Sequence, residues 1–401
     1  MICNREFTHI IVVLFLPFQF QFLHDFYLQA LENIKSKSID FKIPVSQTEA
    51  AEKIFFVACT VGSIIAILIY YKIKKIRLFI SICFGLNAIV WLVYLEFDEK
   101  HFWLAIALRI CNGISTAIFH SVAISYLFCF VTHEYVGFYG YFIQTVMFLS
   151  LALVYLLFTF LGYKTIAIIF AIQDLILAGV IFLVPELKVP SKSITHDYIF
   201  QRHNLHNLFV TVMLMVFQQF CGINIVLRKV PLMLAGIGLD METTLQYVFM
   251  DFVGFLSNFI GSFITYSVPR KIMWCISSFG LVIGLFLFAL TLVTDNLPNW
   301  VGTLGAFLFY LFYGLGVGPI AWYYGGELFG ESLRIEAGAI TLITNQVFTI
   351  VYTYIEQAIQ KKFDDIGSVV LCAIFDFIAI FFGMYFIPTP KNREGGNELF
   401  L

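Results

Sequence analysis

Apolar runs of about 20 residues, separated by short polar stretches, follow one another along the whole chain. A helix needs about 20 apolar residues to cross a lipid bilayer. No small-residue cleavage site follows the first run, so we expect a retained helix rather than a signal peptide. The pattern predicts an all-α membrane protein with twelve transmembrane helices, at residues 8–30, 50–71, 76–95, 102–128, 136–159, 163–184, 206–236, 246–267, 271–293, 301–328, 337–358 and 367–387.

The first and seventh runs are the most interrupted by polar residues, and they hold the same place in two successive sets of six. Internal repeats of this kind are typical of secondary transporters. We therefore predict two six-helix halves, at 1–184 and 208–387. A cytoplasmic linker at 185–207 is expected to join them, and a cytoplasmic tail at 388–401 to follow them.

Basic residues mark two turns that lie six helices apart. Cytoplasmic loops of membrane proteins carry an excess of Lys and Arg. This rule predicts that both chain termini are cytoplasmic, because the basic turns then face inward. The residues are Lys72, Lys74, Lys75 and Arg77 after the second helix, and Arg270 and Lys271 after the eighth.

Composition agrees with this class: 60% of the residues are hydrophobic, 12% are charged and the mean hydropathy is +0.89. Soluble domains carry roughly 25% charged residues. No long basic run indicates a nucleic-acid partner. The eight cysteines show no metal-ligand or disulfide pattern, so neither a metal nor a cofactor is expected. The chain also has no paired catalytic acids, HExxH or GxSxG that we can place at membrane depth, which argues against an enzyme.

Three carboxamides, Gln218, Gln219 and Asn224, interrupt the seventh apolar run. A carboxamide in hydrocarbon costs free energy unless it finds a partner, so it faces a bundle interior or a wet cavity. Its donors and acceptors suit a ligand made of hydroxyl groups. Gly222 and Pro231 favour a broken helix that brings the three amides to one site. The alternative is that they only hold neighbouring helices together.

A second broken helix is predicted within the tenth apolar run, at 301–328. Gly314, Gly316 and Gly318 lower the helical propensity there, and Pro319 removes a backbone donor. Trp322 follows the break and offers a face on which a sugar ring could stack. A packing or interfacial aromatic is the alternative interpretation of this residue.

These motifs resemble those of the sugar porters in the major facilitator superfamily, the group that contains the facilitative glucose transporters. The resemblance covers essentially the whole chain, and the seventh-helix and tenth-helix motifs together make it specific. The matching elements are Phe217–Asn224; Gly318–Trp322 with Glu327-Leu-Phe329 and Arg334; Arg109, Gly113, Tyr126, Gly137, Gly140 and Gln144; Pro185-Glu186; and Pro388–Lys391.

The resemblance implies transport of a hexose-type sugar by alternating access, as facilitated diffusion, in the plasma membrane. It implies a small-molecule sugar substrate and a surrounding bilayer, with no obligate protein partner. The substrate-binding residues that it implies are Gln144, Gln218, Gln219, Asn224, Trp322 and Asn345. The implied network that closes the cytoplasmic gate contains Arg109, Glu327, Arg334, Arg270 and Lys72.

The chain departs from the family in that network. Tyr71, Cys129 and Tyr266 stand where the family has acidic residues; in addition, Lys74 replaces a Gly and Val136 an Arg. Ion pairs formed in only one state set the balance between conformations. Their loss predicts a balance shifted toward the inward-facing state.

The expected binding site departs as well. Gly254 replaces an Asn of the glucose carriers, and Asp251, one turn earlier, could substitute for it. Arg228 and Lys229 replace paired tyrosines that close over sugar from outside. Two adjacent cations within the membrane are expensive unless solvated or paired. They either reach the outer surface or bind an anionic group on the substrate.

Proton coupling is not expected, because Leu23 stands where proton-linked relatives have an Asp. The adjacent His24 and Asp25 keep symport open as an alternative. Two further alternatives are a sugar-binding sensor without transport and a carrier of another polyol or of an anionic sugar derivative, because one fold can serve different solutes.

Overall fold

A computed structural model describes residues 4–37, 45–73, 75–96, 102–187, 199–236, 243–294, 297–298 and 300–388. Nearly all of this described chain is helical, and it contains no strand. Lys74, the middle of the predicted linker and the predicted tail beyond Pro388 lie outside the described residues.

The first six long helices are α1 (Asn4–Lys37), α2 (Val45–Ile73), α3 (Ile76–Val93), α4 (Phe102–Phe130), α5 (Val136–Phe160) and α6 (Tyr163–Val180). The remaining helices are α7 (Leu205–Phe220), α8 (Ile223–Gly236), α9 (Thr243–Ile264), α10 (Arg270–Val293), α11 (Trp300–Leu315), α12 (Val317–Leu328) and α13 (Arg334–Phe386). Short 3₁₀ turns lie at Tyr94–Glu96, His133–Tyr135, Ile181–Leu183, Arg202–Asn204 and Glu331–Leu333.

These helices form twelve membrane spans. Eleven segments of the described chain are long and apolar enough to cross a bilayer. The last, Glu331–Phe386, has 56 residues and contains two spans, because α13 turns sharply at Asp364, where φ is 53° and ψ is −159°. Eleven segments with the last counted twice give twelve, so the predicted all-α, multi-pass membrane fold is confirmed.

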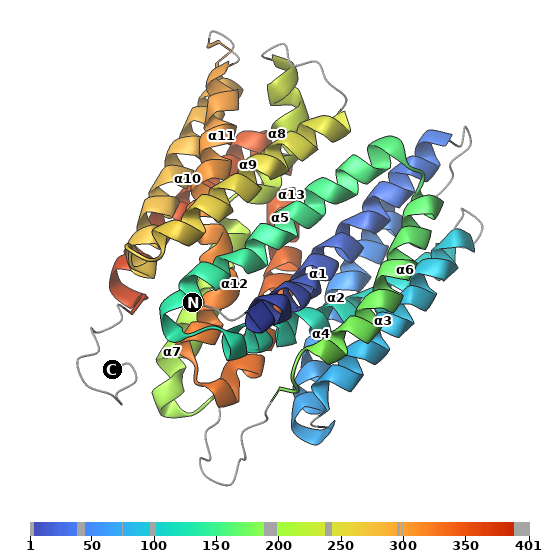
Figure 1. Ribbon diagram of the computed structural model, residues 1–401. Helices are drawn as coiled ribbons and strands as arrows, with labels where there is room; N and C mark the ends of the chain where they lie inside the picture. The colour runs from blue at the N-terminus through green and yellow to red at the C-terminus, as the bar shows by residue number, and fades with distance from the viewer. Residues whose placement is uncertain are drawn as a thin grey trace.

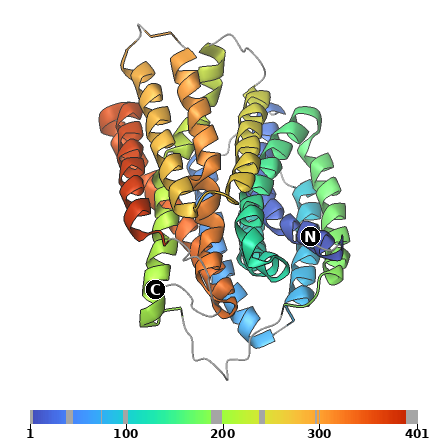
Figure 2. The ribbon, with the colours of Figure 1, turned by 60° about the vertical axis from the view of Figure 1, so that its left-hand side comes forward.

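The helices run side by side along the length of the molecule (Figures 1 and 2). α1–α6 gather on one side and α7–α13 on the other, with α5 and α9 packed together between them (Figure 1). α1 begins and α13 ends at the lower end in Figure 1, which we call the terminal end. We call the opposite end, where α2 begins, the cavity end.

At the terminal end, an ion pair between residues far apart in the sequence joins the start of α3 to the segment that follows the sixth span. The Arg77 Nε of α3 lies 3.1 Å from Glu186 Oε2, and the same guanidinium donates to the carbonyl of Val184 at 2.9 Å. One Arg of the basic turn and the Glu of the Pro185-Glu186 motif therefore fix the end of the sixth span against the start of α3.

The seventh span is broken between α7 and α8. Gly222 lies in this break with φ of +95°, a left-handed conformation that glycine adopts without strain. The amides of Ile225 and Val226 donate to the Gly222 carbonyl and start the second helix. The predicted break is present at Gly222, whereas α8 continues through Pro231.

The tenth span is broken between α11 and α12, again as predicted. Gly316 separates the two helices, and Ser277 of α10 bonds to both of them. The Ser277 hydroxyl donates to the carbonyl of Phe312 at 2.6 Å and accepts from the amide of Val317 at 2.8 Å. From the other helix group, the Tyr141 hydroxyl donates to the Leu315 carbonyl at 2.7 Å. Backbone groups released by the break are thus satisfied by side chains, as the membrane interior requires.

α10 and α11 pack tightly against each other at Gly284. A Cβ at Gly284 would meet the Gly305 carbonyl oxygen at 2.8 Å and the Phe309 amide nitrogen at 2.9 Å, whereas a Cβ at Gly85 of α3 would meet nothing within 4 Å. Overpacking costs about 1–3 kcal/mol. Alanine gains up to about 1 kcal/mol over glycine inside a helix.

We expect Gly284→Ala to lower the thermal unfolding midpoint of the purified protein in detergent, and the matched Gly85→Ala to keep or raise it. Equal midpoints for the two variants would show that α10 and α11 are not packed as described.

Candidate ligand-binding cavity

A cavity of about 580 Å³ lies between the two helix groups. Its walls come from α1, α2 and α5 on one side and from α7, α8, α11, α12 and α13 on the other. It extends from the helix breaks to Glu49, Glu52 and Lys53 in the first turns of α2, at the cavity end. All six residues expected to bind substrate line it: Gln144, Gln218, Gln219, Asn224, Trp322 and Asn345.

Four of the polar side chains form one hydrogen-bonded network. Gln218 Nε2 donates to the Gly318 carbonyl at 3.3 Å and so joins the two broken spans. Gln218 Oε1 accepts from Gln219 Nε2 at 3.1 Å and from Asn345 Nδ2 at 3.3 Å. The Thr349 hydroxyl donates to Gln219 Oε1 at 2.9 Å. The amides therefore hold helices together and line the cavity as well, so the two interpretations of these residues are compatible.

Asn224 lies outside this network. The break at Gly222 places it in the first turn of α8, where it is half-buried and lines the cavity. Its carboxamide makes no hydrogen bond to another side chain of the described chain. Asn224 can therefore offer both a donor and an acceptor to a ligand.

Trp322 lies at the floor of the cavity and is 4% exposed. The ring of His120 packs edge-on against it with centroids 4.6 Å apart, and Phe20 does the same at 6.1 Å. The sequence interpretation missed His120 of α4, because a single histidine in an apolar run carries no motif. The indole is thus held by aromatic packing and presents only a small edge to the cavity.

The polar groups near the cavity end are mostly paired. His24 Nδ1 lies 2.8 Å from Asp25 Oδ1, and Gln21 Nε2 donates to Asp25 Oδ2 at 2.5 Å. Lys53 Nζ lies 3.9 Å from Glu49 Oε2. Within the described chain, the one carboxylate of this wall without an ion pair is Glu52.

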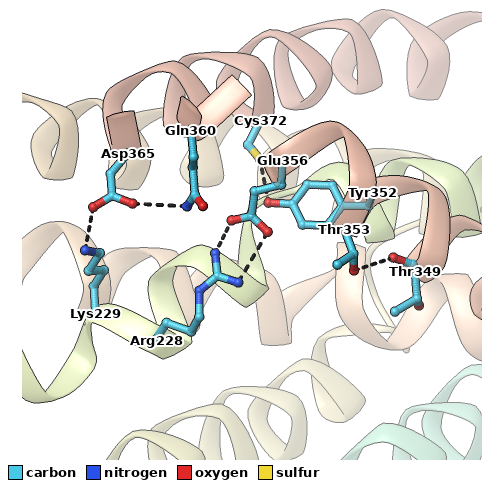
Figure 3. Close-up of polar contacts among 9 residues, drawn as sticks. All are labelled: Arg228, Lys229, Thr349, Tyr352, Thr353, Glu356, Gln360, Asp365 and Cys372. Carbon is cyan, nitrogen blue, oxygen red and sulfur yellow. Dashed lines mark hydrogen bonds and ion pairs between the residues drawn. The ribbon is translucent and has the colours of Figure 1, made fainter. Parts of the chain in front are cut away.

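Arg228 and Lys229 of α8 each bind a carboxylate of α13 (Figure 3). The Arg228 guanidinium takes both oxygens of Glu356, and Lys229 Nζ lies 2.5 Å from Asp365 Oδ2. Protein carboxylates pair with both cations, which weighs against the anion-binding alternative, whereas the 52% exposed side chain of Arg228 is compatible with the outer-surface alternative. Arg228 lines the cavity, but its charge is already matched by a partner.

Asp251 does not substitute for the missing asparagine. Its carboxylate is fully buried in α9 and does not line the cavity. At Gly254 a Cβ would meet the ring of Phe148 at 2.7 Å. The Phe148 ring therefore fills the space beside position 254, so this helix face cannot offer an amide to the cavity.

At the terminal end, the predicted pair Arg270 and Glu327 is brought together. Arg270 Nη2 lies 3.2 Å from Glu327 Oε1, and Arg270 Nε lies 3.3 Å from Oε2. The guanidinium lies directly over Gly137 of α5, where a Cβ would collide with it. The ion pair itself lies within the second helix group, and it holds the Arg270 guanidinium against α5 of the first group.

The other basic residues at this end contribute less. Arg334 lies over the ring of Phe128 at 5.6 Å and 4.0 Å from Glu331 Oε1. Lys72 is exposed and forms no ion pair with another described residue. Tyr71, at a position where the family has an acid, donates its hydroxyl to Glu336 of α13. A tyrosine–carboxylate bond thus joins the two groups despite the missing acid.

Arg109 was expected in the same network, and this expectation is wrong. It lies seven residues into α4, away from Arg270 and Glu327, and is fully buried. Its Nη1 donates to the carbonyls of Leu23 at 3.3 Å and His24 at 3.2 Å. The guanidinium also packs over the rings of Tyr27, at 4.6 Å, and Phe55, at 4.0 Å. Arg109 therefore binds α1 and α2 behind the cavity wall.

The structure adopts a conformation closed at the terminal end, with the cavity extending to the opposite end. The predicted balance toward an inward-facing state stays a prediction. At the closed end, the Tyr71–Glu336 bond joins the two groups, and Arg270, paired with Glu327 in its own group, packs against Gly137 of α5. Losing several acids therefore did not remove the contacts that close this end.

A family model described as "Sugar (and other) transporter" matches residues 184–395, which is 212 of 401 residues and more than half of the chain. Among curated proteins, the facilitated trehalose transporter Tret1 of Apis mellifera ligustica is 24% identical over 201 residues. That match covers 49% of this chain and 40% of the relative, so the chain aligns with less than half of the relative's length.

Solved structures share the fold across nearly the whole chain. The proton:xylose symporter XylE bound to 6-bromo-6-deoxy-D-glucose has a TM-score of 0.79 at 16% identity, covering 96% of each chain. A structure described as the inward-open conformation of the xylose transporter XylE from E. coli scores 0.70 at 16% identity, covering 97% of this chain and 98% of that one.

The amide network gives a prediction that needs no ligand. Gln218→Met would leave the amide donors of Gln219 and Asn345 without the oxygen that they share. An unpaired buried polar group costs about 1–3 kcal/mol. We expect a clear drop in the thermal unfolding midpoint in detergent, and a smaller one for Thr349→Val, which removes a single donor to Gln219. A smaller drop for Gln218→Met than for Thr349→Val would contradict the network.

Proposed function

The chain belongs to the family of sugar (and other) transporters, and on this premise we propose that it carries a neutral sugar across a membrane by alternating access. The observation that supports this most directly is the cavity between the two helix groups, lined by Trp322 and the five expected carboxamides. Amides can replace the hydration of sugar hydroxyls without any covalent step.

The energetics suit a carrier. A neutral hydrogen bond contributes about 1 kcal/mol net, so several together support binding near 1 mM, which corresponds to about 4 kcal/mol. Asn224 is the strongest single candidate for a direct contact, since its amide has no other side chain to bind within the described chain. Gln144, Gln218, Gln219 and Asn345 would complete the ring of donors and acceptors, and Trp322 would form the floor.

The charges of the cavity favour a neutral substrate over an anionic derivative. Both Lys53 and Arg228 are paired with a carboxylate, and Glu52 adds an unmatched negative charge near the mouth. Among the described residues of the cavity, a sugar acid or phosphate would meet no Lys or Arg without a carboxylate partner. We therefore set the anionic alternative aside for this cavity.

Two sizes of sugar, a hexose and a disaccharide, are compatible with this proposal. The family resemblance supports a hexose, and the curated relative is a trehalose transporter by its description, which supports a disaccharide. A cavity of about 580 Å³ admits either. We propose facilitated diffusion without proton coupling. Within the described chain, the Asp25 carboxylate is bound by His24 and Gln21 and pairs with no Lys or Arg, so its protonation would break no ion pair with either residue type.

For the transport cycle, we propose that the two six-helix groups, 1–184 and 208–387, rock about this cavity. The Tyr71–Glu336 bond and the contact of Arg270 with Gly137 would close the terminal end in the state described here and separate in the other. The positive-inside pattern supports a cytoplasmic terminal end. A plasma-membrane location is the family's default, and we adopt it as part of this proposal.

The test is uptake of labelled glucose and labelled trehalose by proteoliposomes that contain the purified protein. We expect saturable uptake of at least one sugar, unaffected by an imposed pH gradient and reduced about tenfold or more by Asn224→Ala. Tenfold corresponds to about 1.4 kcal/mol, the scale of one or two lost hydrogen bonds. Labelled glucuronate should not accumulate.

The other outcomes are informative. Binding of sugar without uptake would replace the carrier by a sensor of the same fold. Uptake that follows the pH gradient would replace uniport by symport. Neither binding nor uptake of any neutral sugar would overturn the proposed substrate class.

A further inference from the structure

The half-helix α8 is attached to the rest of the molecule by a hinge and by two ion pairs. The hinge is Gly222, whose φ of +95° lies directly before the helix. Along its sides, α8 packs against α9 and α11. Ile223, Asn224, Leu227 and Arg228 of its first two turns line the cavity. A rotation of α8 about Gly222 would therefore change the width of the cavity mouth.

The first ion pair joins α8 to the end of the eleventh span. Arg228 Nη1 lies 3.3 Å from Glu356 Oε2, and Nη2 binds Oε1, so the contact is bidentate (Figure 3). The Glu356 side chain is only 4% exposed, whereas that of Arg228 is 52% exposed. A buried carboxylate depends on its partner, because an unpaired charge there is strongly destabilising.

The second ion pair joins α8 to the start of the twelfth span. Lys229 Nζ lies 2.5 Å from Asp365 Oδ2, and Gln360 Nε2 donates to the other oxygen of Asp365 at 3.1 Å (Figure 3). Asp365 directly follows the turn at Asp364, the one non-glycine residue with positive φ in the described chain. α8 is thus tied to both sides of the turn within α13.

Neighbouring residues of a helix point about 100° apart, so Arg228 and Lys229 can bind two different carboxylates at once. Both pairs fix the same stretch of α8 in the same direction, toward α13. A movement of α8 across the cavity mouth and away from α13 lengthens both of them. The two pairs therefore oppose closure and favour the open mouth seen here.

We propose that Arg228–Glu356 and Lys229–Asp365 form a clasp that holds α8 in the open position, and that releasing the clasp lets α8 pivot at Gly222 over the cavity. The consequence for transport rests on the proposed function. The clasp itself is a property of the empty protein and can be measured without any sugar.

The reporter is a cysteine at Leu151, which lines the cavity from α5 in the other helix group. The parent protein carries Leu151→Cys together with Cys111→Ala and Cys129→Ala, which remove the two exposed cysteines of the described chain. The rate of its labelling by a membrane-impermeant maleimide, in detergent and without sugar, reports how open the mouth is. The same protein without Leu151→Cys gives the background.

The variants separate charge from folding. Arg228→Met with Glu356→Met removes the buried pair without leaving a lone charge, and we expect labelling about fivefold slower or more, equivalent to about 1 kcal/mol. Lys229→Met removes the pair whose carboxylate is the more exposed of the two, and it should slow labelling about twofold, because solvent weakens such a pair. The swap Arg228→Glu with Glu356→Arg should return the rate to within about twofold of the parent. Lys362→Met, which removes an exposed cation from the same region without breaking an ion pair, should leave the rate unchanged.

Labelling of the neutral double variant at the parent rate, or a swap that fails to restore it, would overturn the clasp. Slower labelling in a protein that takes up no sugar would support the clasp and remove the transport proposal. Normal uptake with unchanged labelling in every variant would overturn the clasp and support the transport proposal.

Discussion

An unpaired backbone group in the interior of a membrane costs several kcal/mol, and the cavity of this protein depends on how its broken spans meet that constraint. Breaking two spans at Gly222 and Gly316 gives the cavity its walls, but each break releases backbone groups from their helical partners. At the second break, Ser277 and Tyr141 bind the released groups. Gln218 then joins the two broken spans and orders the neighbouring amides. The same hydrogen bonds that stabilise the irregular backbone thus place donors and acceptors around the cavity.

The second organising feature is the pairing of charges at the two ends. At the terminal end, Arg270–Glu327 joins α10 to α12 over Gly137 of α5, where the two helix groups meet. At the cavity end, Arg228–Glu356 binds two elements of the same group. Both pairs lie within the second helix group: the first holds a guanidinium against α5 of the other group, and the second fixes α8 to α13. At the terminal end, Tyr71–Glu336 adds a bond that does join the two groups. Together they account for a molecule closed at one end and open at the other.

Sequence reasoning recovered the twelve spans and both helix breaks, because these depend on apolar length and on local helix-breaking residues. The six cavity residues as a set came from the family resemblance. Sequence reasoning failed where the answer depends on which distant side chain lies opposite. Glu356 is 128 residues from Arg228, and Glu336 is 265 from Tyr71, so no local pattern connects them. Arg109 was misplaced for the same reason: a buried arginine in a span indicates a partner without saying at which end of the helix it lies.

The central claim is that the cavity between the helix groups binds a neutral sugar through its carboxamides, and equilibrium binding to the purified protein in detergent tests it most directly. Labelled glucose and labelled trehalose would be titrated against the wild type and against Asn224→Ala, with glucuronate as competitor. The account predicts saturable binding of a neutral sugar, weakened about tenfold by Asn224→Ala and unaffected by glucuronate. Equal affinity in the variant, or displacement of the sugar by glucuronate, would contradict it.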